Sequence, residues 1–241
     1  MLQNDQKERD IGTIISLHLP KTAGSSFGTA LEKHFGNSLF SDYADLPISK
    51  PVYERNREAL ISSIRIAEQG ISDIRCVHGH FLPVKYLLLN AKKKLFFMTW
   101  MRDPVERAIS HYYFWQRSYD PQRTYLPHHK RVIEEGWSLE RFCLGPEFRN
   151  IYTQYLWGFP LEMFDFIGIV EFYEDDLGYF SRKFLNTGLV AYKVNVGDKS
   201  LEIDPELKKE IGKYHDKDVQ LYQRALQMRL SRNAYQLTDC S

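Results

Sequence analysis

Three runs of hydrophobic residues along the chain predict strands that are buried on both faces. The runs are Ile14–Leu19, Leu95–Trp100 and Phe164–Val170. Each is nearly continuous in apolar residues, as parallel strands covered by helices usually are. A fourth, shorter strand is expected at Ile74–Phe81, where the chain runs into a bend at Gly79.

Between these runs, hydrophobic residues recur at spacings of three and four, which predicts amphipathic helices. Helices are expected at 27–35, 52–69, 83–89, 104–116, 128–135, 139–144, 147–157, 173–186 and 205–232, the last with a break near Lys213. The segments 42–51, 118–127 and 189–199 are expected to connect them. Strands that alternate with helices predict an α/β fold with a central, mostly parallel sheet flanked by helices.

The length and charge of the chain limit its organisation and its partners. A chain of 241 residues suits one α/β domain, and no repeat, low-complexity tract or linker divides it. We therefore expect a single domain over residues 1–241, with a disordered or frayed segment at 1–10. A net charge of +1 gives no electrostatic reason to expect a nucleic-acid or anionic-membrane partner.

The cysteines and the hydropathy of the chain indicate its compartment. Cys76, Cys143 and Cys240 are odd in number and scattered, which argues against a disulfide framework and for a reducing environment. The sequence shows no signal-peptide core and no apolar run long enough to span a bilayer. A cytoplasmic protein is therefore expected.

A short loop of small and polar residues follows the first strand. It consists of Lys21, Thr22, Ala23, Gly24, Ser25 and Ser26. A strand, such a loop and a helix N-terminus aim backbone N–H groups at one point, where an anion is held, and Lys21 adds a cation. The other interpretation is an ordinary turn with a surface lysine. The order differs from an ATP-binding Walker A loop, in which the lysine follows the glycines.

A second group of candidate anion-binding residues follows the second long hydrophobic run. Arg102 leaves the end of this strand, and Ser110 lies two turns into the next helix, on the same face as Arg107. An arginine fork with a serine hydroxyl suits a phosphate dianion. Alternatively, Asp103–Pro104 is a plain helix start and Arg107 is a surface ion-pair partner. Because parallel strands end at one edge of a sheet, two such sites predict a ligand with two separated phosphates.

Together the two segments resemble motifs of the sulfotransferases that use 3′-phosphoadenosine 5′-phosphosulfate (PAPS). The segments are Pro20–Ser26 and Arg102–Ser110, and the branch that they resemble most is the carbohydrate type, notably the uronyl and heparan sulfate 2-O-sulfotransferases. The resemblance implies a P-loop-like, three-layer α/β fold with PAPS as sulfuryl donor. It also implies that residues 21–26 bind the 5′-phosphosulfate and that Arg102 and Ser110 bind the 3′-phosphate.

A pair of histidines after the shorter strand completes the expected site. In the enzymes that the chain resembles, an H-x-H pair supplies the catalytic base, which implies His80 as the base and His78 as its support. The chemistry needs such a group, because an acceptor hydroxyl loses its proton as it attacks sulfur and histidine titrates near neutral pH. Lys21 is expected to stabilise charge on the departing phosphate. His18 and His34 are interpreted as structural.

Other interpretations of these residues remain. Cys76, His78 and His80 alternate along one strand and would share a face suited to Zn²⁺, although no second ligand cluster accompanies them. His78 is alternatively a buried core residue, and Glu171 an alternative base or a structural carboxylate. No metal is predicted, because the strand ends offer no pair of carboxylates for Mg²⁺.

Two other functions compete with a sulfotransferase. A P-loop-like nucleotide kinase would need a G-K-[ST] order, which is missing, and a carboxylate after a strand, for which Asp103, Glu171 and Glu174–Asp176 are the candidates. A non-catalytic nucleotide-binding protein of the same fold would not need His80. For the enzyme, the expected partner is a hydroxylated acceptor, carbohydrate-like or another small molecule, and the sequence does not specify its identity or the oligomeric state.

Overall fold

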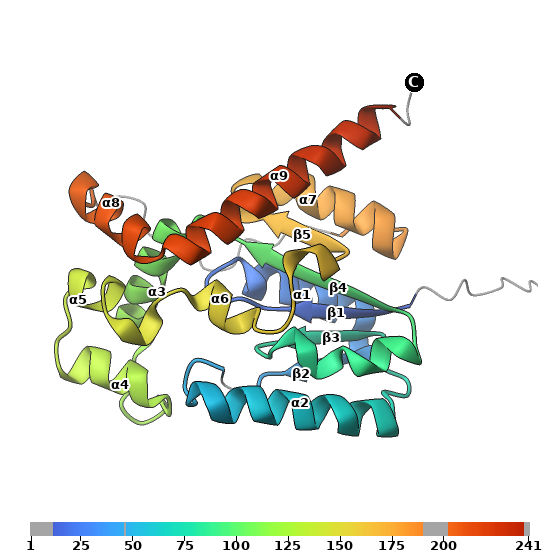
Figure 1. The fold of residues 1–241 in the computed structure, drawn as a ribbon, viewed down its shortest axis with the longest axis horizontal. Coiled ribbons are helices and arrows are strands. Elements are labelled where there is room, and N and C mark those ends of the chain that lie inside the picture. The colour runs from blue at the N-terminus through green and yellow to red at the C-terminus, as the bar shows by residue number, and fades with distance from the viewer. Residues whose placement is uncertain (1–11, 46, 190–201, 239–241) are drawn as a thin grey trace, which may run out of the picture.

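A sheet of five parallel strands forms the centre of the fold, in the spatial order β2-β3-β1-β4-β5 (Figure 1). The strands are β1 (Thr13–Leu17), β2 (Leu39–Asp42), β3 (Cys76–Gly79), β4 (Leu95–Met101) and β5 (Phe166–Ile169). The computed structural model describes residues 12–45, 47–189 and 202–238. The segment predicted to fray at 1–10 and most of the irregular stretch at 189–199 therefore lie outside the described residues.

Helices cover both faces of the sheet because neighbouring residues of each strand point in opposite directions. On β1, Ile14 packs in one cluster with α1 (Gly24–Phe35) and α7 (Tyr173–Phe180), whereas Ile15 packs in a larger cluster on the other side. The larger cluster includes residues of α3 (Pro104–Ser118), α4 (Pro127–Glu134), α5 (Leu139–Cys143), α6 (Ile151–Tyr155), α8 (Pro205–Tyr214) and α9 (Asp216–Thr238). These layers confirm the predicted α/β class.

The edge strand β2 has no counterpart among the predicted strands. Its Phe40 is 48% exposed, and among the described strands β2 pairs with β3 alone. A strand at the edge of a sheet needs no continuous apolar run, so the hydrophobic pattern gives little sign of it. Beyond it, α2 (Val52–Gln69) has the predicted bounds and packs against the short 3₁₀ helices η2 (Pro83–Tyr86) and η3 (Leu88–Ala91), as Figure 1 shows.

A left-handed residue interrupts one predicted helix, and another left-handed residue ends a second helix at its predicted end. The helix predicted at 147–157 is interrupted at Asn150, whose φ of 51° is left-handed, so that α6 begins only after it. The helix predicted at 173–186 is α7 continued by a π-helical turn, and it ends at Asn186 with a φ of 52°. The break predicted near Lys213 is present at His215, between α8 and α9. None of the helices in the described part of the chain is long and apolar enough to cross a membrane.

Acidification is expected to destabilise the protein because buried histidines are held neutral. His78, His111 and His215 are at most 4% exposed, and burial lowers their pKa, to about 4 for His78 and His215. Such a histidine binds its proton more readily in the unfolded chain. The free energy of unfolding therefore falls as the pH drops from the unfolded pKa near 6.5 towards 4. Each shift of this size corresponds to on the order of 3 kcal/mol at the acid end.

Urea unfolding at a series of pH values between about 7.5 and 5 measures this fall in the free energy of unfolding. The transition midpoint should be constant at the alkaline end and fall as the pH drops below the ordinary histidine pKa. His215→Gln should flatten the pH dependence by up to about 1.4 kcal/mol per pH unit, whereas replacement of the exposed His34 by Gln should have a smaller effect. A midpoint that stays constant down to the acid end would contradict the prediction.

Candidate active site

A cavity of about 400 Å³ opens at the edge of the sheet where β1, β3 and β4 end. The structure brings most of the sequence-predicted site residues to this cavity. Those that line it are Lys21, Ala23, Gly24, Ser25, Ser26, His80, Arg102 and Ser110. Thr22 and His78 are not among the lining residues. Three strands thus deliver one site, as expected where parallel strands share an edge.

The loop between β1 and α1 has a backbone geometry that suits an anion. Lys21 and Ala23 adopt positive φ values of 66° and 60°, which residues other than glycine rarely do. Left-handed residues within a turn direct successive N–H groups to one side and form an anion-binding nest. Ala23 is also the N-cap of α1 and makes no side-chain capping bond, and Gly24, predicted as loop, already belongs to the helix. A nest and an uncapped helix N-terminus therefore lie side by side.

The Lys21 ammonium group is held at the cavity by an aromatic ring. Its Nζ lies 3.7 Å from the centroid of the Phe114 ring on α3, which is a cation–π contact. Burial, together with Arg117 and Arg102, lowers the pKa of Lys21 to about 8. Lys21 is therefore mainly charged at neutral pH, and an anion in the cavity would favour its charged form further.

The hydroxyl groups of the loop divide into two kinds. Thr22 is fully buried, and its hydroxyl donates to the carbonyl oxygen of Leu19 at 2.9 Å, so its side chain ties the loop to the end of β1. Ser25 and Ser26 line the cavity. Of the predicted anion-binding residues, Thr22 therefore has a hydroxyl engaged within the loop and does not line the cavity.

Arg102 enters the cavity from a backbone that is fixed on both sides. The hydroxyl of Tyr152 accepts from the Arg102 N–H group at 3.1 Å and donates to the Arg102 carbonyl oxygen at 2.7 Å. The carboxylate of Glu171 accepts from the next N–H group, that of Asp103, at 2.9 Å. Ser110 lines the same cavity from α3. An arginine on a rigid strand end and a serine on a rigid helix suit a fixed phosphate.

Arg107 does not lie where the surface alternative put it. Its side chain is 0% exposed, so the interpretation as a surface ion-pair partner is wrong. Its three guanidinium nitrogens have no hydrogen-bond partner among the described residues. The positive charge lies behind the cavity wall, where it helps burial to lower the pKa of His111, one of the lining residues.

His80 is oriented as a base would be. Its Nδ1 makes a short hydrogen bond with the carbonyl oxygen of His18. Because a carbonyl oxygen can only accept, Nδ1 carries the proton and Nε2 keeps its lone pair. Burial lowers the pKa of His80 to about 4, against the opposing effect of this hydrogen bond. At neutral pH the side chain therefore presents an unprotonated nitrogen at the cavity.

His18 and His78 form a stack of rings with His80. The centroid of the His18 ring lies 4.3 Å from that of His80 and 5.3 Å from that of His78. His78 is buried, and its Nδ1 hydrogen-bonds the Ser16 hydroxyl at 2.9 Å, so it supports the stack from behind. His18 lines the cavity and hydrogen-bonds the Tyr43 hydroxyl at 2.9 Å. The interpretation of His18 as merely structural misses this position.

Gly24→Ala is expected to damage the anion loop, because the His18 ring lies where the new methyl group would go. An ideal Cβ at Gly24 would lie 1.8 Å from Cδ2 and 2.0 Å from Nε2 of His18. The loop or the ring must move, and hydrogen bonds to a bound anion are lost. Affinity for adenosine 3′,5′-bisphosphate (PAP), measured by calorimetric titration, should fall about tenfold to a hundredfold.

Gly188→Ala is the matched control, since a Cβ at Gly188 meets nothing within 4 Å. Equal PAP affinity in the two variants would contradict the assignment of the loop as the anion site.

The zinc and carboxylate alternatives have no geometric support. Cys76 lies in the apolar cluster against α1, where burial raises its pKa. In the part of the chain that the structure describes, His, Cys, Asp and Glu form no group of three that could hold a metal ion. The carboxylate of Glu171 accepts from the Asp103 N–H group and the Tyr222 hydroxyl, so it ties the end of β4 to α9.

Much of the cavity wall comes from residues that no motif marks. These are Pro47, Ile48, Ser49, His111, Trp115, Leu126, Tyr155 and Val170. Residues 47–49 belong to a segment predicted only as a connection. Apolar side chains in connections and helices carry no chemistry of their own, so only the packing of distant segments shows that they share a wall.

Comparisons with known proteins give distant structural likenesses. Neither the family models nor the curated proteins gave a match. The chain is similar to the crystal structure of a sulfotransferase from Alicyclobacillus acidocaldarius, with 18% identity and a TM-score of 0.45 over 87% of this chain and 93% of that one. It is also similar to a mouse sulfotransferase complexed with PAP, with 12% identity and a TM-score of 0.36 over 84% of this chain and 63% of that one. Likenesses this weak assign no activity, so function must be argued from the residues of this chain.

Proposed function

We propose that the chain is a PAPS-dependent sulfotransferase that moves a sulfuryl group to a hydroxyl of a carbohydrate or another small hydroxylated acceptor. The observation that carries the proposal is the meeting of the anion loop, Arg102 and His80 in one cavity, each from the end of a different strand. Two separated anion sites and a neutral base are what sulfuryl transfer from a nucleotide with two phosphate positions requires.

The residues present fit the donor. The nest at Lys21 and Ala23, the uncapped N-terminus of α1 and the hydroxyls of Ser25 and Ser26 would hold the 5′-phosphosulfate. Arg102, supported by Ser110, would hold the 3′-phosphate.

His80 and Lys21 divide the chemical work. His80 Nε2 takes the proton of the acceptor hydroxyl as the acceptor oxygen bonds to sulfur. The bond from sulfur to the bridging phosphate oxygen breaks at the same time, and this oxygen keeps the electron pair. The Lys21 ammonium group stabilises the charge that develops there, by analogy with phosphoryl transfer. The products are a sulfate ester, PAP and a proton on His80, whose low pKa returns the proton to solvent.

A nucleotide kinase is disfavoured by the positions of its candidate carboxylates. Asp103 accepts from the N–H groups at the start of α3, and Glu171 is engaged with α9. Asp176 is buried and accepts from the Ile169 N–H group and from Arg229. Among the described residues that line the cavity there is no Asp or Glu. A metal-bridged nucleotide would lack the acidic ligand that Walker B carboxylates supply.

Thermal-shift measurements with PAP, PAPS and ATP–Mg²⁺ test the proposal. PAP and PAPS should raise the melting temperature, because a ligand that binds only the folded state stabilises it. Arg102→Met should abolish the shift, whereas Arg123→Met, at a side chain that is 89% exposed, should keep it. A shift with ATP–Mg²⁺ and none with PAP would sink the proposal. A PAP shift without sulfated product from any acceptor would favour the non-catalytic nucleotide-binding protein.

The organisation of the protein in the cell belongs to the same proposal. We treat residues 1–241 as one sulfotransferase domain that needs no metal and works in the cytoplasm. The near-neutral charge of +1 supports a protein without a nucleic-acid partner. Fractionation of the source cells, with sulfotransferase activity followed in each fraction, tests the location.

A further inference from the structure

The charged side chains of the cavity are all required by the donor. Among the lining residues, the side chains with a formal charge at neutral pH are Lys21 and Arg102. On the proposed function, Lys21 serves the 5′-phosphosulfate and Arg102 the 3′-phosphate. The remainder of the described cavity wall carries no formal charge, so the acceptor meets an uncharged surface.

The acceptor end of the cavity can be located from His80. A hydroxyl that gives its proton to His80 must come within hydrogen-bond distance of Nε2. Besides the ring of His18, the rings close to this side chain are those of Tyr43, at 4.9 Å between centroids, and Tyr155, at 6.1 Å. Further along the wall lie Ile48 and Trp115, the latter stacked on the ring of a buried histidine. Aromatic and aliphatic side chains therefore make up much of the cavity wall.

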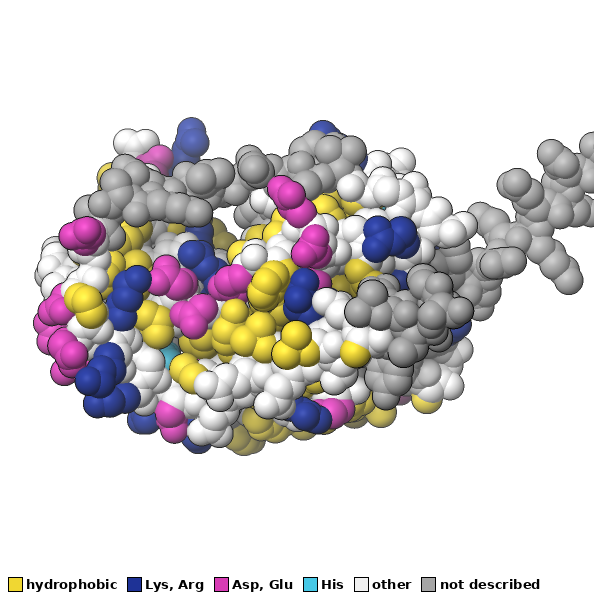
Figure 2. Space-filling model, turned by 90° about the horizontal axis from the view of Figure 1, so that it is seen from above, with side chains coloured by type: hydrophobic (Ala, Val, Ile, Leu, Met, Phe, Trp, Pro, Cys, Tyr) yellow, Lys and Arg dark blue, Asp and Glu magenta, His cyan; other side chains and the backbone are white. Residues whose placement is uncertain are grey.

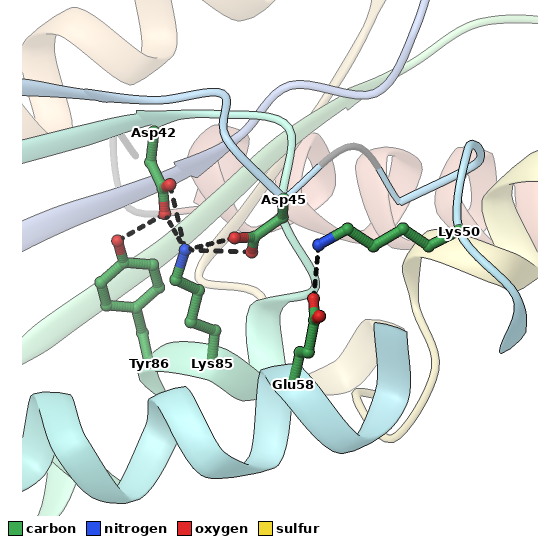
Figure 3. Close-up of polar contacts among 6 residues, drawn as sticks. All are labelled: Asp42, Asp45, Lys50, Glu58, Lys85 and Tyr86. Atoms are coloured by element: carbon green, nitrogen blue, oxygen red, sulfur yellow. Dashed lines mark hydrogen bonds and ion pairs between the residues drawn. The ribbon is translucent and has the colours of Figure 1, made fainter. Parts of the chain in front are cut away.

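The chain on either side of Ile48, at residues 43–45 and 47–51, is held by ion pairs near both of its ends (Figure 3). Near the first end, the Lys85 ammonium lies 2.8 Å from the Asp42 carboxylate and 2.9 Å from that of Asp45. Near the second end, Lys50 pairs with Glu58 of α2. These contacts hold Ile48 in position. Ile48, Trp115 and Tyr155 belong to the apolar part of the cavity lining, called here the apolar wall.

Three cations close to this wall are engaged with other groups, whereas Arg107, which has no hydrogen-bond partner among the described residues, lies behind the wall and does not line the cavity. Lys85 is shared between two carboxylates, and Lys50 is paired with one. Arg55 is buried and donates to the Pro47 carbonyl oxygen at 3.0 Å and to the Gln154 side chain at 2.7 Å. None of these three cations lines the cavity. An acidic group on the acceptor would find no free cation among them.

From this wall we infer that the acceptor is an uncharged alcohol or phenol with a compact, apolar ring, not an anionic polysaccharide. The inference rests on the proposed function, because it places the acceptor between His80 and the donor. A carboxylate or sulfate group on the acceptor would lose its hydration without a compensating partner and would be repelled by the donor. The cavity volume of about 400 Å³ is also shared with the donor, which favours a small acceptor.

The face of the molecule seen in Figure 2 has no continuous basic surface, among its described residues, that would bind a polyanion. There, basic and acidic side chains of the described residues are interspersed around hydrophobic ones over α8 and α9. A long anionic chain binds best along a continuous track of one sign, and this face does not provide one.

A comparison of sulfation rates for different acceptors tests the inference. With labelled PAPS, kcat/KM is compared for 2-naphthol, a neutral alkyl glucoside and a desulfated uronate polysaccharide. At least one of the neutral acceptors should have a kcat/KM about tenfold or more above that of the polysaccharide, whose concentration is counted per disaccharide. Of the two neutral acceptors, 2-naphthol should have the higher kcat/KM, and a clear preference for the glucoside would contradict the apolar ring.

A positive charge introduced into the apolar wall provides a second test of the inference. Ile48→Arg should lower kcat/KM for the better neutral acceptor about tenfold or more and raise that for the uronate polymer, while PAP affinity stays unchanged. Leu60→Arg on α2, where the leucine is 47% exposed, should alter neither. If PAP binds and the polysaccharide is the best acceptor, or if no neutral acceptor is sulfated, the inference is wrong. If PAP does not bind, the proposed function itself fails.

Discussion

His80→Asn is expected to lower kcat by about 10²- to 10⁴-fold while the affinity for PAP is unchanged. The reason is geometric. The Nδ1 proton of His80 is committed to the His18 carbonyl oxygen, which leaves Nε2 as the nitrogen that can take a proton. Asparagine is similar in length and still offers a donor, but its amide is not basic. Steady-state rates with saturating PAPS and calorimetric titration with PAP separate the two effects.

The pH dependence of kcat/KM should show which group is responsible. His80, with a pKa of about 4, is active as a base when neutral, so the rate should be lost only as the pH falls through that value. Lys21, with a pKa of about 8 in the free protein, is active when charged, so the rate should also fall as the pH rises through about 8. The acid limb should be missing from the residual activity of His80→Asn. An acid limb near the ordinary pKa of histidine would contradict the assignment.

His34→Asn is the matched control, because His34 is exposed and lies away from the cavity lining. It should retain the full rate. A His80 variant that lost PAP affinity in proportion to its rate would make the residue part of the nucleotide site and not the base.

Lys21→Ala should lower kcat more than it lowers the affinity for PAP. The lysine charge is most valuable where negative charge grows during the reaction, and removal of one such donor costs about 10²- to 10³-fold in rate. In the ground state, the backbone N–H groups of the loop and the N-terminus of α1 remain to hold the anion. Single-turnover rates at saturating PAPS, compared with calorimetric PAP affinity, measure the two effects.

Lys209→Ala provides the control, since that lysine is 59% exposed and, among the described residues, pairs with Glu206 of its own helix. If Lys21→Ala loses PAP affinity and turns over normally at saturation, the lysine serves binding and the proposed role in the transfer step is wrong. Phe114→Leu adds a finer comparison. It removes the cation–π contact at 3.7 Å and keeps the charge, so its effect on rate should be smaller than that of Lys21→Ala.

The sequence by itself indicates the α/β class and the chemistry-bearing residues. Continuous apolar runs such as Leu95–Trp100 specify buried parallel strands, and the residues just after such strands meet at one edge. Lys21, Arg102 and His80 could be singled out for that reason, since their local order along the chain already places them at strand ends. These properties depend only on residues that lie within a few positions of each other in the chain.

Tertiary structure alone decided which of these residues face a ligand and what surrounds them. Thr22 looks like an anion ligand in sequence, yet its hydroxyl is turned to Leu19. Arg107 lies one helical turn from Ser110, yet it is fully buried while Ser110 lines the cavity. The direction of each side chain depends on which elements pack against it, and hydrophobic spacing does not specify those partners.

The apolar wall is the clearest case of long-range determination. Ile48 and Tyr155 are more than a hundred positions apart in the chain and share one cavity only because β2 and α6 are brought to the same edge of the sheet. The edge strand β2 is itself half exposed, and the hydrophobic pattern does not predict it. The proposed donor site can thus be predicted from local motifs, because phosphate recognition uses backbone and charge in short segments. The proposed acceptor site cannot, because an apolar pocket forms only where side chains from distant segments pack together.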